Sequence, residues 1–322
     1  MISEKWDEKV IELAKSLINC QSYSGHEDKA AEALKTYMKE AGVFDEIETD
    51  CYGNVIGHIK EKSWPEVLFD GHIDTVPVGN LKDWKHDPFH AVVEDGKLYG
   101  RGAADMKGAV AAFTVAAHRY AVENGKNFAG DVYVAGVVHE ECFEGVAARK
   151  ISAKVKPDYV VIGEASEMNL KVGQRGRAEI VVETFGVPAH SANPEKGVNA
   201  VYKMCEAIQA IREIEPPVQD KLGKGILELT DVKSSHIQEP PLFRNTAVAT
   251  YDRRLLVGET KESVLQPIIE KMEELKKKDP QFSYKVSLCS GKKRNATPEK
   301  KSRENVFSQA GCLAQKRSGW QK

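Results

Sequence analysis

The stretch VLFDGHID, residues 67–74, joins a short apolar run to a histidine flanked by two aspartates. The three apolar side chains predict a buried β-strand, and the polar residues after them predict its carboxyl end. His72 and Asp74 lie two residues apart, so in extended backbone their side chains point to the same side. One of them can bind a metal ion while the other orients the imidazole. Taken alone, a His-x-Asp pattern fits a structural histidine better.

Three further segments place carboxylates after apolar or glycine-rich runs. Asp105 ends GRGAAD ahead of a predicted small-residue helix, the pair Glu140-Glu141 follows seven non-polar residues, and Glu164 follows YVVIG. The carboxyl ends of parallel strands meet at one edge of a sheet, so we expect these side chains to form one site with His72. Their mixture of oxygen and nitrogen donors suits a divalent metal ion.

These segments differ in how strongly they indicate a site. Asp105 precedes a predicted helix and has a structural alternative as its N-cap. The adjacent carboxylates of Glu140 and Glu141 are costly to place beside a core unless a metal ion or a shared proton compensates for them. In strand geometry their side chains diverge, so one can bind a metal ion while the other acts as a general base.

Helix and strand patterns alternate up to about residue 163, which predicts an α/β fold with a mostly parallel sheet and helices on both faces. The helices are expected at about 4–19, 27–41, 107–124 and 143–154, and the strands at about 54–60, 66–70, 130–138 and 159–163, with a hairpin at 94–96. From residue 178 the order becomes β-α-β-β-α-β, the ferredoxin-like arrangement, which predicts an inserted α+β domain. We therefore expect a catalytic metal-binding domain over 1–177 and a lid or dimerisation domain over 178–290.

The composition limits the classes of partner. A net charge of −2 over 322 residues gives no reason to expect nucleic acid or an anionic membrane as partner. The most apolar segment, 108–117, is about half as long as a bilayer span, and six scattered cysteines without a CxxC pair favour a cytoplasmic protein. Residues 291–322 hold nine Lys or Arg against two Glu. We interpret this basic tail as a solvated or atypical terminus rather than a nucleic-acid-binding arm.

Four motifs taken together resemble those of the dinuclear zinc aminopeptidase-like hydrolases: DGHIDTVP (70–77), GRGAADMKG (100–108), HEEC (139–142) and GEAS (163–166). This superfamily includes acetylornithine deacetylase, succinyl-diaminopimelate desuccinylase, aminoacylase and glutamate carboxypeptidase. The resemblance covers about residues 5–290 and is strongest to the hydrolases associated with selenium and purine metabolism. It implies hydrolysis of an amide bond in a small-molecule substrate, an N-acyl amino acid or a dipeptide, with two zinc ions, or alternatively cobalt or manganese.

The resemblance also implies roles for the residues of the four motifs. His72 and Glu164 would bind the first metal ion, Asp105 would bridge both ions, and Glu141 would bind the second. Glu140 would be the general base, which takes a proton from the attacking water, and Asp74 would support His72.

In the lid, the resemblance implies contacts beyond the chain's own metal site. PAHSA (188–192) resembles the motif whose histidine, here His190, reaches the active site of the partner subunit in a homodimer and helps to hold the developing oxyanion. DRR (252–254) resembles an Asp-x-Arg element, which makes Arg254 a candidate for binding a substrate carboxylate.

The sequence departs from the family pattern in two places. The second metal ion normally has a terminal histidine from a C-terminal segment that returns to the catalytic sheet, but the last histidine here is His236. No returning segment is recognisable after about residue 290, so we expect an incomplete catalytic domain and impaired activity. The family's Asn-x-Ile-Pro element also reads PLFR at 241–244. A truncation, a shifted reading frame or real divergence would each explain both departures.

Two other functions compete with amide hydrolysis. A non-catalytic protein that keeps the fold, binds metal and dimerises fits the missing histidine, although the intact acidic pair at 140–141 argues against it. A dinucleotide-binding enzyme would explain the glycines of GRG (100–102), but Asp105 stands where the third glycine is needed.

Overall fold

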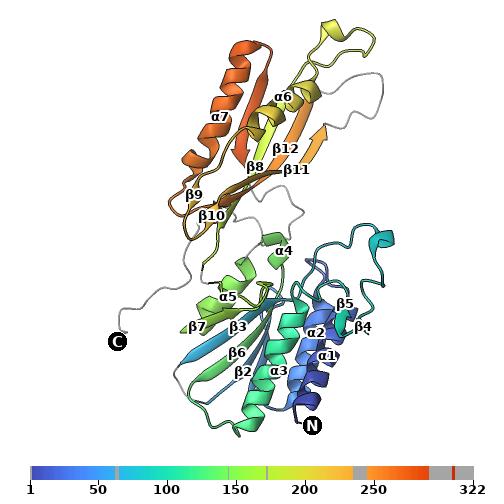
Figure 1. Ribbon diagram of the computed structural model, residues 1–322, viewed down its shortest axis with the longest axis vertical. Helices are drawn as coiled ribbons and strands as arrows, with labels where there is room; N and C mark the ends of the chain where they lie inside the picture. Colours follow the sequence, from blue (N-terminus) through green and yellow to red (C-terminus); the bar gives the residue numbers. More distant parts are fainter. Residues whose placement is uncertain are drawn as a thin grey trace. The chain divides into compact units, whose positions relative to one another are not determined.

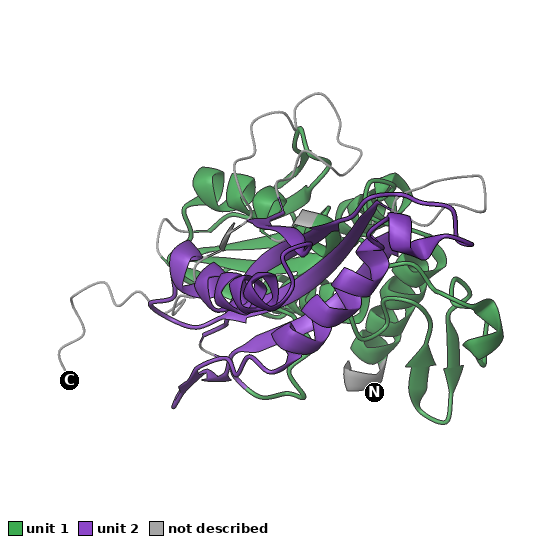
Figure 2. Cartoon of the chain, turned by 90° about the horizontal axis from the view of Figure 1, so that it is seen from above, with its two compact units in different colours: residues 1–169 green, residues 170–322 purple. Residues whose placement is uncertain are grey.

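The chain forms two compact units, residues 1–169 and residues 170–322 (Figure 2). The computed structural model describes residues 2–61, 65–143, 145–171, 173–234, 245–289 and 307–308. Each unit has its own sheet and its own hydrophobic core. The boundary between the units falls ahead of the boundary expected at residue 177. Among the described residues, no helix has the length and apolar character needed to cross a membrane.

The first unit alternates helices and strands along the chain. Its elements are α1 (Ile2–Asn19), α2 (Asp28–Ala41), β1 (Glu46–Thr49), β2 (Val55–Ile59), β3 (Glu66–His72), a 3-10 turn at Leu81–Asp83, β4 (Val92–Glu94), β5 (Lys97–Tyr99), α3 (Lys107–Glu123), β6 (Asp131–Val137), α4 (Glu140–Phe143), α5 (Val146–Val155) and β7 (Tyr159–Ile162). The predicted hairpin is present as β4 and β5, which pair antiparallel.

The main sheet has the order β1-β2-β6-β3-β7. β3 pairs in parallel with β6 and β7, whereas β2 pairs antiparallel with both β6 and β1. Four of the five strands therefore run in one direction, which confirms the mostly parallel sheet. The register places His72 opposite Val137, so the carboxyl ends of β3 and β6 lie side by side.

Helices cover both faces of this sheet, as expected: α1, α2 and α3 pack on one face and α5 on the other (Figure 1). The close approach of α3 explains the glycine in the DGH sequence. A Cβ atom at Gly71 would fall within 3 Å of side-chain atoms of Met106, Val110 and Phe113. Gly71 thus lets the start of α3, and the loop before it, lie directly against the end of β3.

The second unit contains β8 (Gly176–Phe185), a 3-10 turn at Pro194–Lys196, α6 (Ala200–Arg212), β9 (Val218–Gln219), β10 (Gly223–Lys224), β11 (Ile226–Ser234), β12 (Thr246–Leu255), α7 (Lys261–Lys278), β13 (Ser283–Leu288) and β14 (Phe307–Ser308). Its antiparallel sheet has the order β11-β12-β8-β13, and β14 also pairs with β8. This is the predicted ferredoxin-like arrangement. The short β9–β10 hairpin was not predicted.

Candidate metal centre

His72 ends β3 with its side chain only 2% exposed. Its Nδ1 atom lies 2.9 Å from the backbone carbonyl oxygen of Asp74, and a carbonyl oxygen can only accept, so Nδ1 carries a proton. This leaves Nε2 as the atom that faces the site. It lies 2.8 Å from Oδ1 of Asp105 and 3.6 Å from Oε1 of Glu164. A backbone-fixed Nδ1 with Nε2 directed at carboxylates is the usual arrangement of a metal-binding histidine.

The structure brings five of the predicted site residues together at the carboxyl edge of the sheet. Two groups have ligand atoms within 4.8 Å of one another: His72 with Glu140 and Glu164, and His72 with Asp105 and Glu141. Nitrogen and carboxylate oxygen donors that lie this close together suit a divalent metal ion. His72 belongs to both groups, and Glu140 groups with Glu164, which differs from the division into two metal sites that the resemblance implied.

The acidic pair lies in a short helix rather than at the end of a strand. β6 ends at Val137, and α4 begins at Glu140. Between them His139 adopts a left-handed backbone conformation with φ of 60°. The chain therefore turns sharply at His139. The turn places the backbone amides of Glu140 and Glu141 within reach of a buried carboxylate.

That carboxylate belongs to Asp74, whose side chain is fully buried. Its Oδ1 atom accepts the amide of Glu140 and its Oδ2 atom the amide of Glu141, both at 3.1 Å. Oδ2 also accepts the hydroxyl of Ser24 at 2.6 Å, and Oδ1 lies 3.5 Å from Nδ1 of His72. Burial by itself raises the pKa of Asp74, but hydrogen bonds from His72 and Ser24 outweigh it and hold the pKa below its usual value. Asp74 thus orients the histidine and fixes the acidic pair.

The pKa values of the clustered residues indicate that bound cations would stabilise the carboxylates. Burial raises the pKa of Glu140, and the neighbouring carboxylates raise it further, whereas the charge of His72 lowers it. The resulting pKa is about 7. The pKa values of Glu141 and Glu164 are also raised, with burial the largest cause. Burial would lower the pKa of His72, but the hydrogen bond and charge of Asp74, together with Glu140 and Glu164, raise it to about 10. A metal ion bound by these residues would replace the protons and offset the negative charge of the carboxylates.

Sequence reasoning missed three residues that support the cluster. Ser24 and Glu27 lie in the α1–α2 connection, and Glu27 accepts the backbone amide of His139 at 3.0 Å. Lys107 is fully buried at the start of α3 and donates from Nζ to the carbonyl oxygens of Leu17 and Cys20, both at 2.8 Å. Burial lowers the pKa of Lys107 to about 8. These bonds tie the loop that carries Asp105 to the end of α1.

His190 and Arg254 belong to the second unit. His190 is exposed in a turn where its Nδ1 accepts the amide of Ala192 at 3.1 Å. Arg254 donates from Nε to Asp252 at 2.7 Å, and Asp252 also binds Arg177. The roles expected for His190 and Arg254 involve a partner subunit and a substrate, so they stay predictions. His236, residues 241–244 and the tail apart from 307–308 lie outside the described residues.

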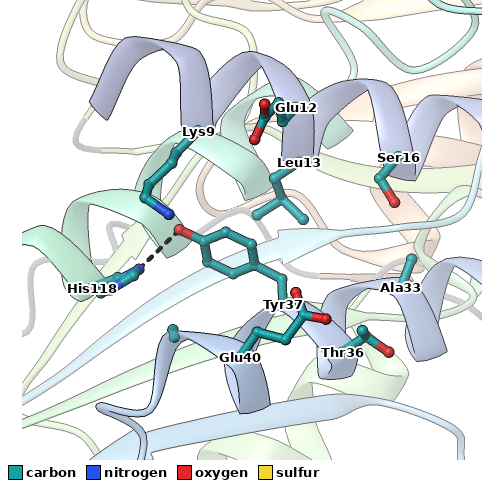
Figure 3. A pocket seen from close by; sticks show the side chains of 10 residues that line it. Lys9, Glu12, Leu13, Ser16, Ala33, Thr36, Tyr37, Glu40 and His118 are labelled. Carbon is teal, nitrogen blue, oxygen red and sulfur yellow. Dashed lines mark hydrogen bonds between the residues drawn. The ribbon is translucent and has the colours of Figure 1, made fainter. Parts of the chain in front are cut away.

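A separate cavity of about 260 Å³ lies between α1, α2 and α3. Tyr37 crosses it from α2, and its hydroxyl lies 3.0 Å from Nδ1 of His118 on α3 (Figure 3). Burial, with the charge of Glu12, raises the pKa of Tyr37 to about 12, so this hydroxyl stays protonated. The Tyr37–His118 pair satisfies buried polar groups between packed helices, and none of the predicted site residues lines the cavity.

The sequence of this chain is similar to that of a known protein family and of several known proteins. The model of peptidase family M20/M25/M40 matches residues 68–305, and the chain belongs to this family. It is 33% identical over 259 residues to the uncharacterized protein YgeY of Escherichia coli K12, covering 79% of this chain and 63% of that protein. It is 34% identical over 216 residues to a succinyl-diaminopimelate desuccinylase of Wolbachia pipientis, covering 63% of this chain and 54% of that protein.

Solved structures share the fold at low identity. Aminopeptidase PepT of Bacillus cereus has a TM-score of 0.62 at 20% identity, covering 88% of this chain and 75% of that one. The dipeptidase Dug1p of Saccharomyces cerevisiae has a TM-score of 0.66 at 14% identity, covering 89% and 77%. The chain thus spans about three quarters of these structures, and 63% of the length of YgeY.

We expect added zinc to raise the melting temperature of the metal-free protein, and this rise to grow between about pH 5 and pH 8. The raised pKa values of Glu140, about 7, and His72, about 10, mean that the folded chain binds extra protons over this range. The stability of the metal-free protein therefore falls as pH rises, whereas zinc, which replaces those protons, stabilises more at higher pH. At 100 times the dissociation constant the stabilisation is about 2.7 kcal/mol, or roughly 5–10 °C in a calorimetric scan.

The matched control for this scan is Asp131, a carboxylate at the opposite end of β6. Asp131→Asn should keep the zinc-induced rise, and Glu164→Gln should reduce it. A rise that is equal at pH 5 and pH 8 would contradict this assignment of the metal ligands.

Proposed function

We propose that this chain is a metal-dependent hydrolase that cleaves an amide bond in a small substrate, an N-acyl amino acid or a dipeptide. One observation carries the proposal: His72 and the carboxylates of Asp105, Glu140, Glu141 and Glu164 converge at the carboxyl edge of the sheet. Family membership supports the same reaction class, since relatives named as a desuccinylase and as peptidases belong to this group.

The cluster would hold two divalent ions, zinc in our proposal with cobalt or manganese as alternatives. Bound there, the ions would polarise the scissile carbonyl and lower the pKa of the attacking water. The Nε2 atom of His72 can bind only one of them, so the other ion would have carboxylate ligands alone among the described residues. We therefore propose that the second ion is bound more weakly and that the activity of this chain is impaired accordingly.

Glu140 would be the general base. Its carboxylate groups with His72 and Glu164, where it could take a proton from the attacking water and return it to the leaving amine. Water adds its oxygen to the acyl carbon, and the products are a carboxylate and an amine. The hydrogen bond that the Glu140 amide donates to Asp74 keeps the Glu140 side chain beside the cluster while the proton moves.

Glu140→Gln should lower kcat by about 10²–10⁴-fold on the substrate that the enzyme accepts, because the amide keeps the shape of the side chain but cannot take a proton. Zinc binding should be nearly unchanged. The assay is hydrolysis of a panel of N-acetyl amino acids and dipeptides by the zinc-loaded protein. Glu123→Gln, at the exposed end of α3, is the control and should keep full activity. Retention of most activity by Glu140→Gln would move the base role to another residue.

We further propose a cytoplasmic homodimer that forms through the second unit, with His190 serving the partner's metal centre and Arg254 binding a substrate carboxylate. β11 supports this arrangement, because it is a nine-residue strand at the edge of its sheet. Its side chains Ile226 and Val232 are 40% and 46% exposed. No other described strand pairs with this edge, and an edge strand of this length pairs readily with a second copy in a two-fold dimer.

Sedimentation velocity over a range of concentrations tests the dimer. We expect wild type to sediment as a dimer and Val232→Lys as a monomer, because a charge on an edge strand opposes pairing. Val93→Lys, which replaces an equally exposed valine on β4 in the first unit, should remain dimeric. A wild-type monomer at every concentration, or a dimeric Val232→Lys variant, would contradict the proposal.

A non-catalytic metal-binding protein is the second candidate function. The single histidine in the described cluster favours it, since one of the two ions lacks a nitrogen ligand. Turnover in the Glu140 assay distinguishes the two candidates.

A further inference from the structure

The connection between α1 and α2 lies against the metal centre although it is far from it in sequence. The hydroxyl of Ser24 donates to Asp74 at 2.6 Å. The backbone amide of Thr75 donates to the carbonyl oxygen of Ser22 at 2.9 Å, next to a parallel bridge between Tyr23 and Thr75. This connection therefore runs alongside the segment that follows β3.

Glu27 extends these contacts to the loop that carries the acidic pair. The residue is 5% exposed, and its Oε1 atom accepts the backbone amides of Gly25 at 2.9 Å and His139 at 3.0 Å. The same oxygen lies 3.4 Å from Nδ1 of His139. Buried carboxylates need hydrogen-bond donors to offset their lost hydration, and one of these donors is the backbone amide of His139.

Helix capping does not account for this side chain. Glu27 is the N-cap residue of α2, and its backbone carbonyl accepts the amide of Ala31 at 2.9 Å. Its side chain makes no hydrogen bond to the first turn of the helix. The carboxylate is directed away from α2, toward the turn between β6 and α4.

The position of that turn determines where Glu140 lies. His139 holds a φ of 60°, a left-handed conformation that is unfavourable for a residue with a Cβ. Its amide is bound by Glu27, and the next amide along the chain, that of Glu140, is bound by Asp74. Two successive amides are therefore held by two buried carboxylates from different parts of the chain.

We propose that Glu27 is a positioning residue for Glu140: by binding the His139 amide it holds the turn that places the Glu140 carboxylate beside the metal centre. The proposal rests on the proposed function, in which Glu140 is the general base. Glu27 touches neither the metal ligands nor the reacting atoms, and it acts through the backbone of His139.

The test compares Glu27→Ala with Glu27→Gln in the zinc-loaded protein. Glu27→Ala should lower kcat by about 10–100-fold, because small displacements of a catalytic group cost that much, while KM and zinc stoichiometry stay unchanged. Glu27→Gln keeps an acceptor oxygen at the same place and should retain kcat within a few-fold. An unchanged kcat in Glu27→Ala would overturn the proposal, and so would an equal loss in both variants.

Asp131 provides a matched control at the other end of β6. Like Glu27, it accepts a backbone amide, that of Glu61 at 2.9 Å, and binds a histidine, His58, at 2.9 Å. Asp131→Ala should lower the melting temperature as much as Glu27→Ala does but leave kcat unchanged. A similar loss of kcat in both variants would show a general loss of stability instead of positioning.

A double variant tests whether Glu27 acts through Glu140. In the Glu140→Gln background, the further change Glu27→Ala should lower the residual rate less than about twofold, because the base that it positions is already lost. A full 10–100-fold loss in that background would overturn the proposal.

Hydrogen exchange separates this proposal from the proposed function. The amide of His139 should lose protection in Glu27→Ala and keep it in Asp131→Ala, whether or not the chain hydrolyses any substrate. An inactive wild type would defeat the proposed function alone, whereas unchanged protection in Glu27→Ala would defeat the positioning role. If Glu27→Ala does not fold, Glu27→Asp, whose carboxylate is one methylene too short, should show the same loss of protection and kcat.

Discussion

The buried carboxylate of Asp74 is the constraint on which the metal centre depends. It lies two residues beyond the end of β3, where no solvent reaches it, and must be satisfied within the protein. Its four contacts come from three segments: the imidazole of His72, the hydroxyl of Ser24, and the amides of Glu140 and Glu141. This side chain therefore sets the position of both acidic residues, and the backbone carbonyl oxygen of the same residue holds the imidazole of His72.

The parallel strands bring these segments within reach of Asp74. β6 and β7 flank β3 and run in the same direction, so the residues after all three strands gather at one edge. Gly71 lets α3 approach that edge, and Lys107 ties the start of α3 to the last turn of α1. The edge strand β7 keeps Tyr159, Val160, Val161 and Ile162 44–48% exposed. The site is thus supported from the α1 and α3 side, while no described strand of the first unit pairs with the outer edge of β7.

Much of the fold could be predicted because strands and helices follow from local sequence patterns. The candidate metal ligands were predicted from the same patterns, and the structure brings them together. Apolar runs that end in Asp, His or Glu mark strand ends such as those of β3 and β7. The alternation of strands and helices then predicts that these ends meet at one edge of a parallel sheet. Ser24, Glu27 and Lys107 were missed because their partners lie 50 to 112 residues away. The acidic pair was expected in strand geometry, but the backbone φ of His139 starts a helix there, and no local pattern predicted that turn.

We infer that Asp74 organises the candidate metal centre formed by His72 and the carboxylates around it. Calorimetric titration of zinc into the metal-free protein at neutral pH tests this most directly, with Asp74→Ala beside the wild type. We expect one tight equivalent and a weaker second in the wild type, since a single histidine serves the cluster. The tight equivalent should weaken by about 10–100-fold in Asp74→Ala, the usual effect of removing a residue that orients a ligand. Two equally tight equivalents in the wild type, or zinc affinity that does not change in Asp74→Ala, would contradict the account.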